Sequence, residues 1–238
     1  MITEIADESM SHMLACLMNA IAFEAGWEEQ YEGQDIRKGI FTNADRSTST
    51  VRMLHSNEDT YIENESFTGF VKPYKDGEFS FMALLPKEKG TEFMKRSLED
   101  INFTKLWEES AYTEVDVTMP EFKYDFGEDL TNLFQDLGIE TLFTDRADFS
   151  PMSSEWLKID SIIHKAHIEV DRKGTKAAAV TAAVVLTGCA MIPEDPKEVC
   201  LDRPFIYAII QEETGLPIFA GIMNHAEEDK SFRDNKEK

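Results

Sequence analysis

The sequence predicts an α+β protein that is rich in β-strands and has only a few helices. Two observations lead to this prediction: alternating or continuously apolar segments of strand length recur along the chain, and amphipathic segments with a helical period are few. The strand-helix alternation of a doubly wound enzyme is missing, and no internal repeat is visible. With 238 residues, 42% of them hydrophobic, and no Pro/Gly/Ser-rich linker, we expect one domain with a real core.

The expected strands are spread over the whole chain. The apolar run at 14–23 predicts a strand that is buried on both faces, and the run at 79–86, stopped by Pro86, predicts another strand. Further strands are expected within residues 39–70 and at 113–122, 161–170, 205–210 and 217–223. The last two flank the turn-like segment EETG, so we expect them to form a hairpin.

Helices are expected in two places. Residues 92–110 are amphipathic and predict a helix, and a second helix is indicated by apolar residues at helical spacing, namely Leu130, Leu133, Phe134 and Leu137. Gly138 follows this second group and is a typical helix stop.

Charge and motifs exclude several classes of function. The formal net charge of -22, from 46 acidic and 24 basic residues, disfavours nucleic acid and membrane partners. No apolar run reaches the ~20 residues of a membrane span, and the first residues lack the features of a signal peptide. No GxSxG, HExxH or P-loop pattern indicates an enzyme, and no cofactor is expected.

The cysteines and histidines do not predict a metal site. Cys16, Cys189 and Cys200 form no CxxC or Cys/His spacing, and three cysteines cannot all pair. His164 and His167 lie three residues apart on an expected strand, so their side chains face opposite ways and cannot reach one metal ion.

Five segments resemble one family in a consistent order. They are MNAIAFEAGW at 18–27, VKPYKDGEFSFMALLP at 71–86, MPEFKYDFGEDLTNLFQDLGI at 119–139, HKAHIEVDRKGTKAAAVTAAVV at 164–185, and DRPFIYAIIQEETGLPIFAGIMN at 202–224. Together they resemble the serpins, inhibitors of serine proteases. The resemblance implies a serpin-like, multi-sheet β architecture with a few helices. It covers residues 1–238 as one partial serpin domain, from which the N-terminal helical part is missing, with a reactive-centre loop at about 174–200.

The resemblance also implies a mechanism that is not catalysis. A serpin presents its loop as bait to a serine protease, or sometimes a cysteine protease. After cleavage the protease stays acyl-linked, and the loop enters the main sheet as an additional strand and distorts the trapped enzyme. The implied partner is therefore a target protease.

The residues of the loop agree with this role. Gly174 supplies backbone freedom, and no proline occurs at 175–192 to block the hydrogen bonds of a new strand. A period of two places Thr175, Ala177, Ala179, Thr181 and Ala183 on one face, all small enough to enter a packed sheet. The resemblance assigns the hinge to Gly174, Thr175, Lys176, Ala177, Ala178, Ala179, Val180 and Thr181. By composition alone, the stretch is equally typical of an alanine-rich helix or a flexible linker.

The cleaved bond is expected within a short apolar window. Family spacing from Gly174 indicates the bond near 188–189, and the candidates are Leu186, Thr187, Gly188, Cys189, Ala190 and Met191. Because no Lys or Arg occurs at 177–196, a trypsin-like protease would leave the acid of its pocket unpaired. Elastase-like or subtilisin-like proteases fit better, and a papain-like protease stays open. Cys189 would make inhibition sensitive to oxidation, unless it is an exposed cysteine without a role.

The resemblance assigns two further sites. Asn19 and His164 match the shutter, where polar groups bond across the strands that must part, although a bonded pair of core residues would give the same pattern. Trp27 matches the breach, where the loop enters the sheet, although a lone tryptophan is more often ordinary core. Glu121 and Arg172 occupy breach positions at which many serpins have the opposite charges, so we expect a reversed ion pair or two unrelated surface charges.

Two alternatives to inhibition stay open. A non-inhibitory, serpin-like binding or carrier protein is one, and an inactive fragment of an inhibitor is the other. The family is often extracellular, so an extracellular or cell-surface location is expected.

Overall fold

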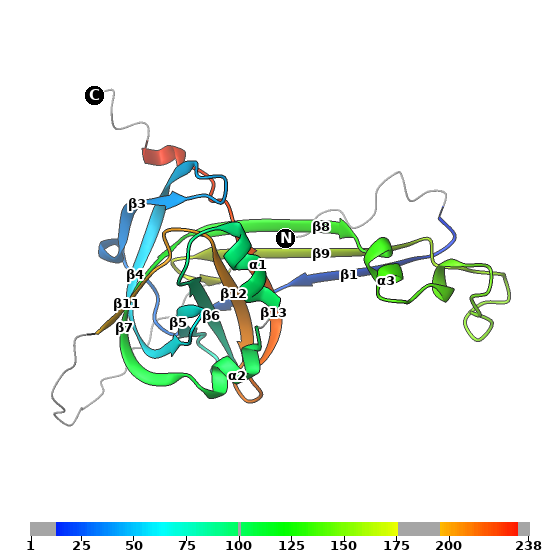
Figure 1. Ribbon diagram of the computed structural model, residues 1–238, viewed down its shortest axis with the longest axis horizontal. Coiled ribbons are helices and arrows are strands. Elements are labelled where there is room, and N and C mark those ends of the chain that lie inside the picture. The colour runs from blue at the N-terminus through cyan, green and yellow to red at the C-terminus, as the bar shows by residue number, and fades with distance from the viewer. Residues whose placement is uncertain (1–12, 100, 176–195, 233–238) are drawn as a thin grey trace. The chain divides into compact units, whose positions relative to one another are not determined.

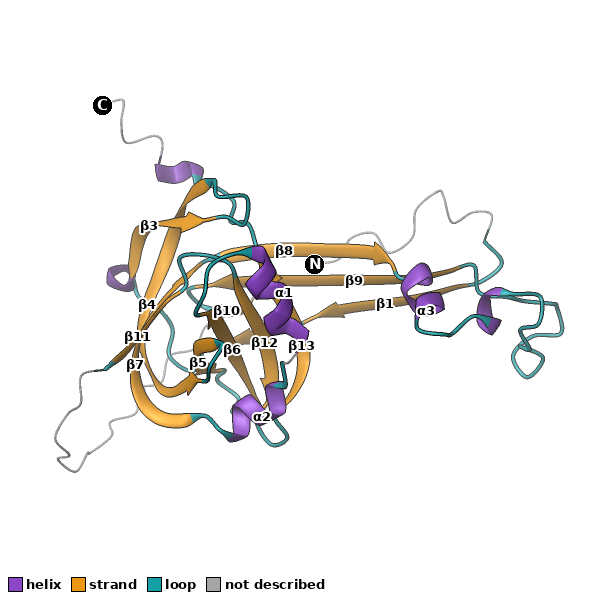
Figure 2. Ribbon diagram, viewed as in Figure 1, coloured by secondary structure: helices purple, strands orange, loops and turns teal. Residues whose placement is uncertain are grey.

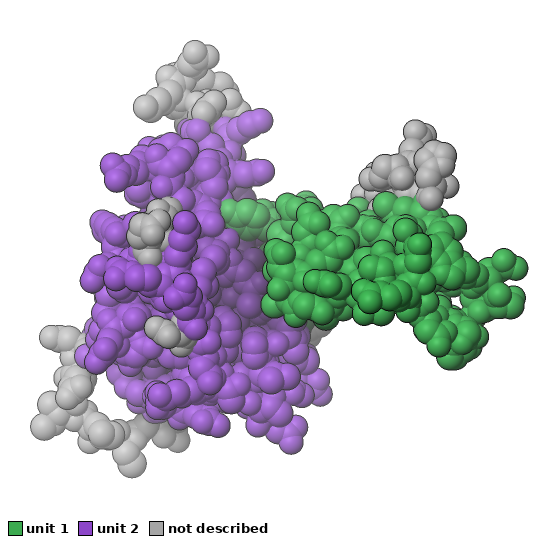
Figure 3. Space-filling view, turned by 45° about the vertical axis from the view of Figure 1, so that its right-hand side comes forward, with its two compact units in different colours: residues 1–23, 123–169 green, residues 24–122, 170–238 purple. Residues whose placement is uncertain are grey.

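The computed structural model describes residues 13–99, 101–175 and 196–232 (Figure 1). The chain divides into two compact units (Figure 3). Unit 1 consists of Met1–Phe23 and Lys123–Glu169, and unit 2 of Glu24–Phe122 and Val170–Lys238. Each unit therefore combines two stretches that are distant in the sequence. In both units strands dominate the regular structure, in agreement with the predicted α+β class (Figure 2).

Unit 1 is built on three strands with short helical turns beside them. Its elements are β1 (Cys16–Ala22), β8 (Phe122–Asp129), α3 (Thr131–Asp136), η3 (Thr141–Phe143) and β9 (Ser161–Asp171), although Phe122 and the last two residues of β9 belong to unit 2. Strand β1 pairs with β9 in parallel over its whole length, from Cys16 opposite Ser161 to Ala22 opposite His167. Strand β8 also pairs with β9.

The expectation that the strand at 14–23 is buried on both faces is wrong. Strand β1 is present, but four of its seven residues in a row are exposed, including Leu17 and Met18 at 47% and 48%. Pairing with β9 satisfies the backbone along one edge and leaves the faces of a strand to water unless another layer packs on them. Apolar composition alone does not provide that layer.

Unit 2 contains an eight-stranded sheet in the order β11-β7-β4-β5-β6-β12-β13, with β3 paired to β4. These strands are β3 (Ile36–Thr42), β4 (Thr48–Glu63), β5 (Phe67–Pro73), β6 (Phe79–Pro86), β7 (Ala111–Pro120), β11 (Lys197–Cys200), β12 (Phe205–Gln211) and β13 (Leu216–Met223). Two very short strands, β2 (Ala25–Gly26) and β10 (Gly174–Thr175), pair with each other, and β10 also pairs with the end of β9. The turns η2 (Gly33–Asp35) and η4 (Lys230–Phe232) complete the unit.

The burial of each strand follows its sequence pattern. Seven of the eight residues of β6 and six of the seven residues of β12 are buried, as expected for continuously apolar strands in the middle of a sheet. Strand β7 alternates instead: the buried residues Val115, Val117 and Met119 lie on one face, and the strand ends at Pro120, which is also buried. Strands β12 and β13 form the predicted hairpin.

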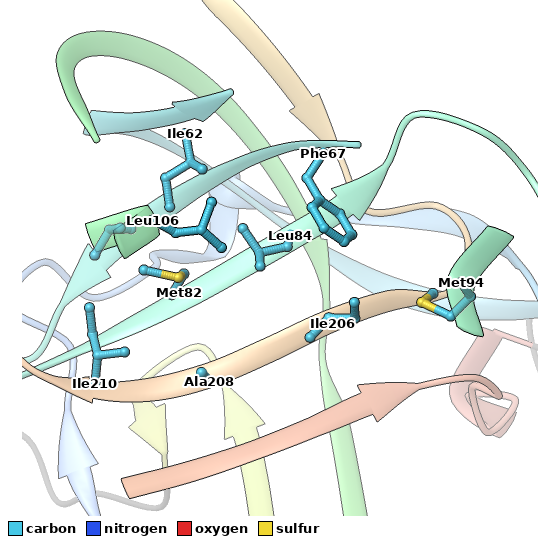
Figure 4. Close-up of a cluster of buried hydrophobic side chains, with 10 residues drawn as sticks. Ile62, Phe67, Met82, Leu84, Met94, Leu106, Ile206, Ala208 and Ile210 are labelled. Carbon is cyan, nitrogen blue, oxygen red and sulfur yellow. The ribbon is translucent and has the colours of Figure 1, made fainter. Parts of the chain in front are cut away.

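One face of the sheet carries a hydrophobic core under the two helices of this unit (Figure 4). Strands β4, β5, β6 and β12 contribute most of it, and α1 (Thr91–Glu99) and α2 (Phe103–Glu108) each contribute one buried side chain, Met94 and Leu106. The sequence predicts a single helix at 92–110, whereas the structure has two. The side chain of Asn102 accepts a hydrogen bond from the backbone of Lys105 and so begins a new helix.

None of the helices in the described part of the chain has the length and hydropathy of a membrane span.

Candidate functional site

The loop singled out by the sequence begins where β9 ends. Strand β9 stops at Asp171, the chain turns through Arg172 and Lys173, and Gly174 and Thr175 form β10. The chain is described again from Pro196, which leads into β11. Most of the predicted loop sites lie outside the described residues, namely Lys176, Ala177, Ala178, Ala179, Val180 and Thr181 of the hinge and Leu186, Thr187, Gly188, Cys189, Ala190 and Met191 around the reactive bond.

Gly174 occupies a position that only glycine fits. Its φ of +148° lies in a region that other residues rarely adopt, and a Cβ atom there would collide with the backbone carbonyl of Ala25 and lie 2.6 Å from the Cα atom of Gly26. The carboxylate of Asp171 accepts hydrogen bonds from the backbone N–H groups of Lys173 and Gly174, at 2.7 and 3.2 Å. The turn that begins the loop is therefore sharply defined.

Trp27 holds this turn from the interior of unit 2. Its side chain is fully buried and stacks on Tyr74 with ring centroids 4.7 Å apart. The indole Nε1 donates to the carbonyl of Asp171 at 2.8 Å, and the backbone N–H of Trp27 donates to the carbonyl of Lys173 at 3.0 Å. The hydroxyls of Tyr74 and Thr175 share a hydrogen bond of 2.6 Å. Trp27 and Tyr74 thus form hydrogen bonds to residues both before and after the turn.

A buried ion pair lies next to Trp27, and sequence reasoning missed it. The Nζ atom of Lys72 donates to Glu58 Oε1 at 2.6 Å, and the side chains are only 2% and 6% exposed. The ammonium lies over the ring of Tyr31 at 4.7 Å and over that of Trp27 at 5.7 Å. The hydroxyl of Ser56 also donates to Glu58. The signal in the sequence was a single lysine inside the apolar strand FTGFVKP.

Burial raises the pKa of the acidic groups in this cluster. It raises the pKa of the Glu58 carboxyl, an effect that Lys72 opposes by its charge and its hydrogen bond. Burial also raises the pKa of the hydroxyls of Tyr31 and Tyr74, which therefore stay neutral at any physiological pH. The positive charge of Lys72 is thus balanced by Glu58 alone among these residues.

Glu121 and Arg172 are close together, but not as the predicted reversed ion pair. The carboxylate of Glu121 accepts a hydrogen bond from the backbone N–H of Arg172 at 3.3 Å, and it pairs with the guanidinium of Arg52 at 3.6 Å. Burial raises the pKa of Glu121, and the nearby charge of Arg52 opposes this shift. Arg52 also pairs with Asp229 at 2.8 Å. Sequence reasoning missed Arg52 because it lies far away in the chain.

Asn19 and His164 meet in unit 1, directly opposite each other on β1 and β9. The amide Nδ2 of Asn19 donates to Nδ1 of His164 at 3.2 Å, so that nitrogen of the imidazole acts as the acceptor. The ring of Phe126 on β8 lies 5.9 Å from that of His164. Asn19 is exposed, and the bond crosses the two paired strands in contact with water rather than within a core.

His167, which the sequence does not single out for a role, points away from this pair. It is 4% exposed, its Nδ1 donates to Asp125 at 2.6 Å, and its Nε2 has no hydrogen-bond partner within the described structure. This hydrogen bond is the main reason why the pKa of Asp125 is lowered. Glu169 lies 3.9 Å from Nε2. No group of three metal-ligating side chains occurs among the residues that the structure describes.

Comparisons with known proteins converge on one family. A family model described as serpin (serine protease inhibitor) matches residues 1–226. An uncharacterized serpin-like protein of Thermococcus kodakarensis is 31% identical over 209 residues, which are 87% of this chain and 49% of that protein. Leukocyte elastase inhibitor A of Mus musculus is 34% identical over 226 residues, which are 90% of this chain and 58% of that protein.

The solved structures agree. The thermophilic serpin tengpin in its native state superposes with a TM-score of 0.82 and 36% sequence identity, covering 94% of this chain and 59% of that one. This chain spans about half the length of the curated relatives that it matches. The extent of the family match and the level of identity lead to one conclusion: the chain belongs to the serpin family.

Proposed function

We propose that this chain inhibits serine proteases as a suicide substrate, with residues 174–200 as the reactive-centre loop. One observation carries the proposal. The first two residues of the loop already pair with β9 in antiparallel fashion, Gly174 opposite Asp171 and Thr175 opposite Val170. In this register each further loop residue pairs with the residue one step back along β9, which brings Thr181 opposite His164.

The proposed insertion displaces β1. Strand β1 now pairs with β9 from Ser161 to His167. In the proposed register, the loop residues after Ala177 would pair with this same part of β9. The backbone hydrogen bonds lost from β1 are replaced by those of the inserted strand, so the exchange costs little in hydrogen bonding. The hydrogen bond between Asn19 and His164 must break in this exchange. The chain itself performs no catalysis under this proposal, because the attacking group belongs to the protease.

The partner that we propose is a serine protease with a shallow or apolar primary pocket. Residues 186–191 offer only small, aliphatic or sulfur-containing side chains. A protease pocket with a buried acid would find no Lys or Arg at residues 177–196, which is costly because the acid stays unpaired. The relative named leukocyte elastase inhibitor A supports an elastase-like target.

The experiment is to incubate the chain, and the longer product if its coding sequence extends upstream, with an elastase-like and a subtilisin-like protease. We expect a covalent complex that survives denaturing electrophoresis, and mass spectrometry of the released peptide identifies the cleaved bond. Cleavage without any complex, in the longer product as well, would contradict inhibition and favour a non-inhibitory serpin. A complex formed only by the longer product would identify this chain as an inactive fragment.

A matched variant separates insertion from simple cleavage. In Ala179→Pro the proline removes a backbone donor in the middle of the strand that must form, whereas the bond near 188–189 stays accessible. We expect cleavage at the same bond and loss of the covalent complex. Lys176→Ala serves as control because Lys176 is predicted to lie on the other face, so trapping should persist. If Ala179→Pro traps protease as well as the parent chain, insertion is not the mechanism.

A further inference from the structure

Unit 2 contains a cavity of about 560 Å³ whose described lining includes neither end of the loop nor the cluster around Trp27. Helix α1 forms one wall through Met94 and Leu98, which lie four residues apart and therefore on one face of the helix, and Gly90 lies directly before it. The opposite walls come from Pro86, Pro204 and Ile222, at the ends of β6, β12 and β13. The volume lies within the roughly 300–1,000 Å³ that small-molecule sites occupy.

The walls of this cavity are fixed by hydrogen bonds that do not involve a ligand. The buried side chain of Asn43 donates to the hydroxyls of Ser47 and Ser49 at 2.9 and 3.0 Å, and accepts from the backbone of Ala226 at 2.9 Å. The guanidinium of Arg203 donates to the carbonyl of Pro86 at 2.6 Å. A cavity held in this way is preformed, which lowers the entropic cost of binding.

The charge at the cavity is opposite to that of the chain. Among the described residues, four cationic ones line it, Arg46, Lys89, Lys95 and Arg203, against one acid, Glu88, and Lys95 already has another contact. The whole chain has a net charge of -22, so this local excess of positive charge runs against its composition. Arg203 also contacts Asp202 at 3.8 Å, and its side chain remains 15% exposed with further N–H donors. Cationic side chains around an apolar cavity complement a ligand that has both an anionic group and an apolar part.

We infer that this cavity binds a small amphipathic anion, with the anionic group among the cations and an aliphatic tail against Met94, Leu98 and Ile222. An apolar hollow with a few convergent polar groups is the usual form of a small-molecule site. The charged group gives orientation and the apolar walls give most of the affinity. This binding does not depend on the proposed protease inhibition, because Gly174, Thr175 and residues 196–200, the described part of the loop, do not line the cavity.

The test is calorimetric titration of the chain with decanoate and, separately, with decan-1-ol, which has the same tail but no charge. We expect saturable binding of one decanoate per chain, tighter than that of the alcohol. The double variant Arg46→Asn and Lys89→Gln removes two exposed cations, and asparagine tolerates the positive φ of 69° at position 46. We expect it to weaken decanoate binding about 3- to 10-fold and to leave the alcohol unchanged.

Two more variants change the affinity in defined directions. Glu88→Gln removes the negative charge of an acid in the described lining and should tighten decanoate binding about two- to fivefold. Leu98→Asp places a charge on the apolar wall and should weaken both ligands, and its urea unfolding midpoint verifies that it is folded. Lys105→Gln is the control, since Lys105 lies on α2 outside the cavity and is 65% exposed.

Three results would overturn the inference. They are equal affinity for decanoate and the alcohol, an equal loss of decanoate affinity in the Lys105→Gln control, and decanoate binding that survives Leu98→Asp. Sedimentation provides a fourth: a dimer of the parent chain that Leu98→Asp dissolves would mean that a second copy, and not a small anion, occupies the cavity.

Discussion

Replacing Lys72 by methionine should destabilise unit 2 by about 3–5 kcal/mol, because it leaves the buried carboxylate of Glu58 without its counter-charge. The pair is 2% and 6% exposed, with a contact of 2.6 Å, so water cannot replace the lost cation. Methionine keeps most of the length and apolar surface of the lysine side chain, so the substitution leaves little empty space in the core and adds little cost from a cavity. Against a typical total stability of about 5–15 kcal/mol, the loss is large.

The assay is urea unfolding followed by circular dichroism. With a denaturant slope of about 1–3 kcal/mol per M, a loss of about 3–5 kcal/mol should lower the midpoint by about 1–5 M. The double variant Lys72→Met and Glu58→Met should recover most of this loss, because no buried charge is left. The control is Lys105→Met, whose partner Glu109 is 63% exposed, and it should change stability by less than about 0.5 kcal/mol.

The pH dependence of this loss has a defined sign. Burial raises the pKa of Glu58 above its ordinary value of 4.5, and removal of Lys72 raises it further. An acid with a raised folded-state pKa destabilises the fold as the pH rises through that pKa, and not below the unfolded value. The difference between Lys72→Met and the parent chain should therefore be larger at pH 8 than at pH 5. A difference under about 1 kcal/mol, or one that is equal at both pH values, would refute the argument from burial.

Three further changes test other parts of the fold. Gly174→Ala should lower the urea midpoint by the equivalent of about 2–3 kcal/mol through its clash and its φ, whereas Gly77→Ala, with a φ of +67° and open space around its Cβ position, should cost only about 1 kcal/mol. Asn102→Ala removes the cap of α2 and should cost about 1 kcal/mol and speed amide exchange in that helix. Hydroxyl donors lower the pKa of Asp129, so its contribution to stability is present above about pH 4 and is lost as the pH falls through the lowered pKa. Asp129→Asn should therefore lower the midpoint at pH 7, and this effect should shrink as the pH falls through the lowered pKa of Asp129.

Local patterns predicted those elements whose burial depends on their immediate neighbours. The run at 79–86 is a buried strand because β5 and β12 flank it on both edges, which a continuously apolar segment indicates. The helix stop at Gly138 is also local: its φ of +89° permits the last turn of α3 to close, with the N–H of Ile139 bonded to the carbonyl of Phe134. These features need no knowledge of distant parts of the chain.

The ion pairs that the sequence did not predict depend on contacts between residues that are distant in the chain. A lysine at position 72 looks like a solvent-exposed residue until Glu58, fourteen positions earlier, is placed beside it on the neighbouring strand. In the same way, the partner of Glu121 is the guanidinium of Arg52 and not that of Arg172, because β4 and β7 pair near those residues. Charge complementarity is satisfied in both cases, but composition and spacing do not reveal which cation provides it.

Strand β9 is held by two kinds of contact that differ greatly in strength. Towards β1, the hydrogen bond from Asn19 to His164 is exposed and worth about 0.5–1.5 kcal/mol at most, and parallel pairing is slightly weaker than antiparallel pairing. At Asp171, the fully buried Trp27 stacks on Tyr74 and donates to the backbone, and losing such an aromatic side chain costs about 3–5 kcal/mol. Under the proposed mechanism the loop must keep its start fixed and displace β1. The strand that has to yield is therefore the one that is held weakly, and the turn that has to stay in place is the one that is buried.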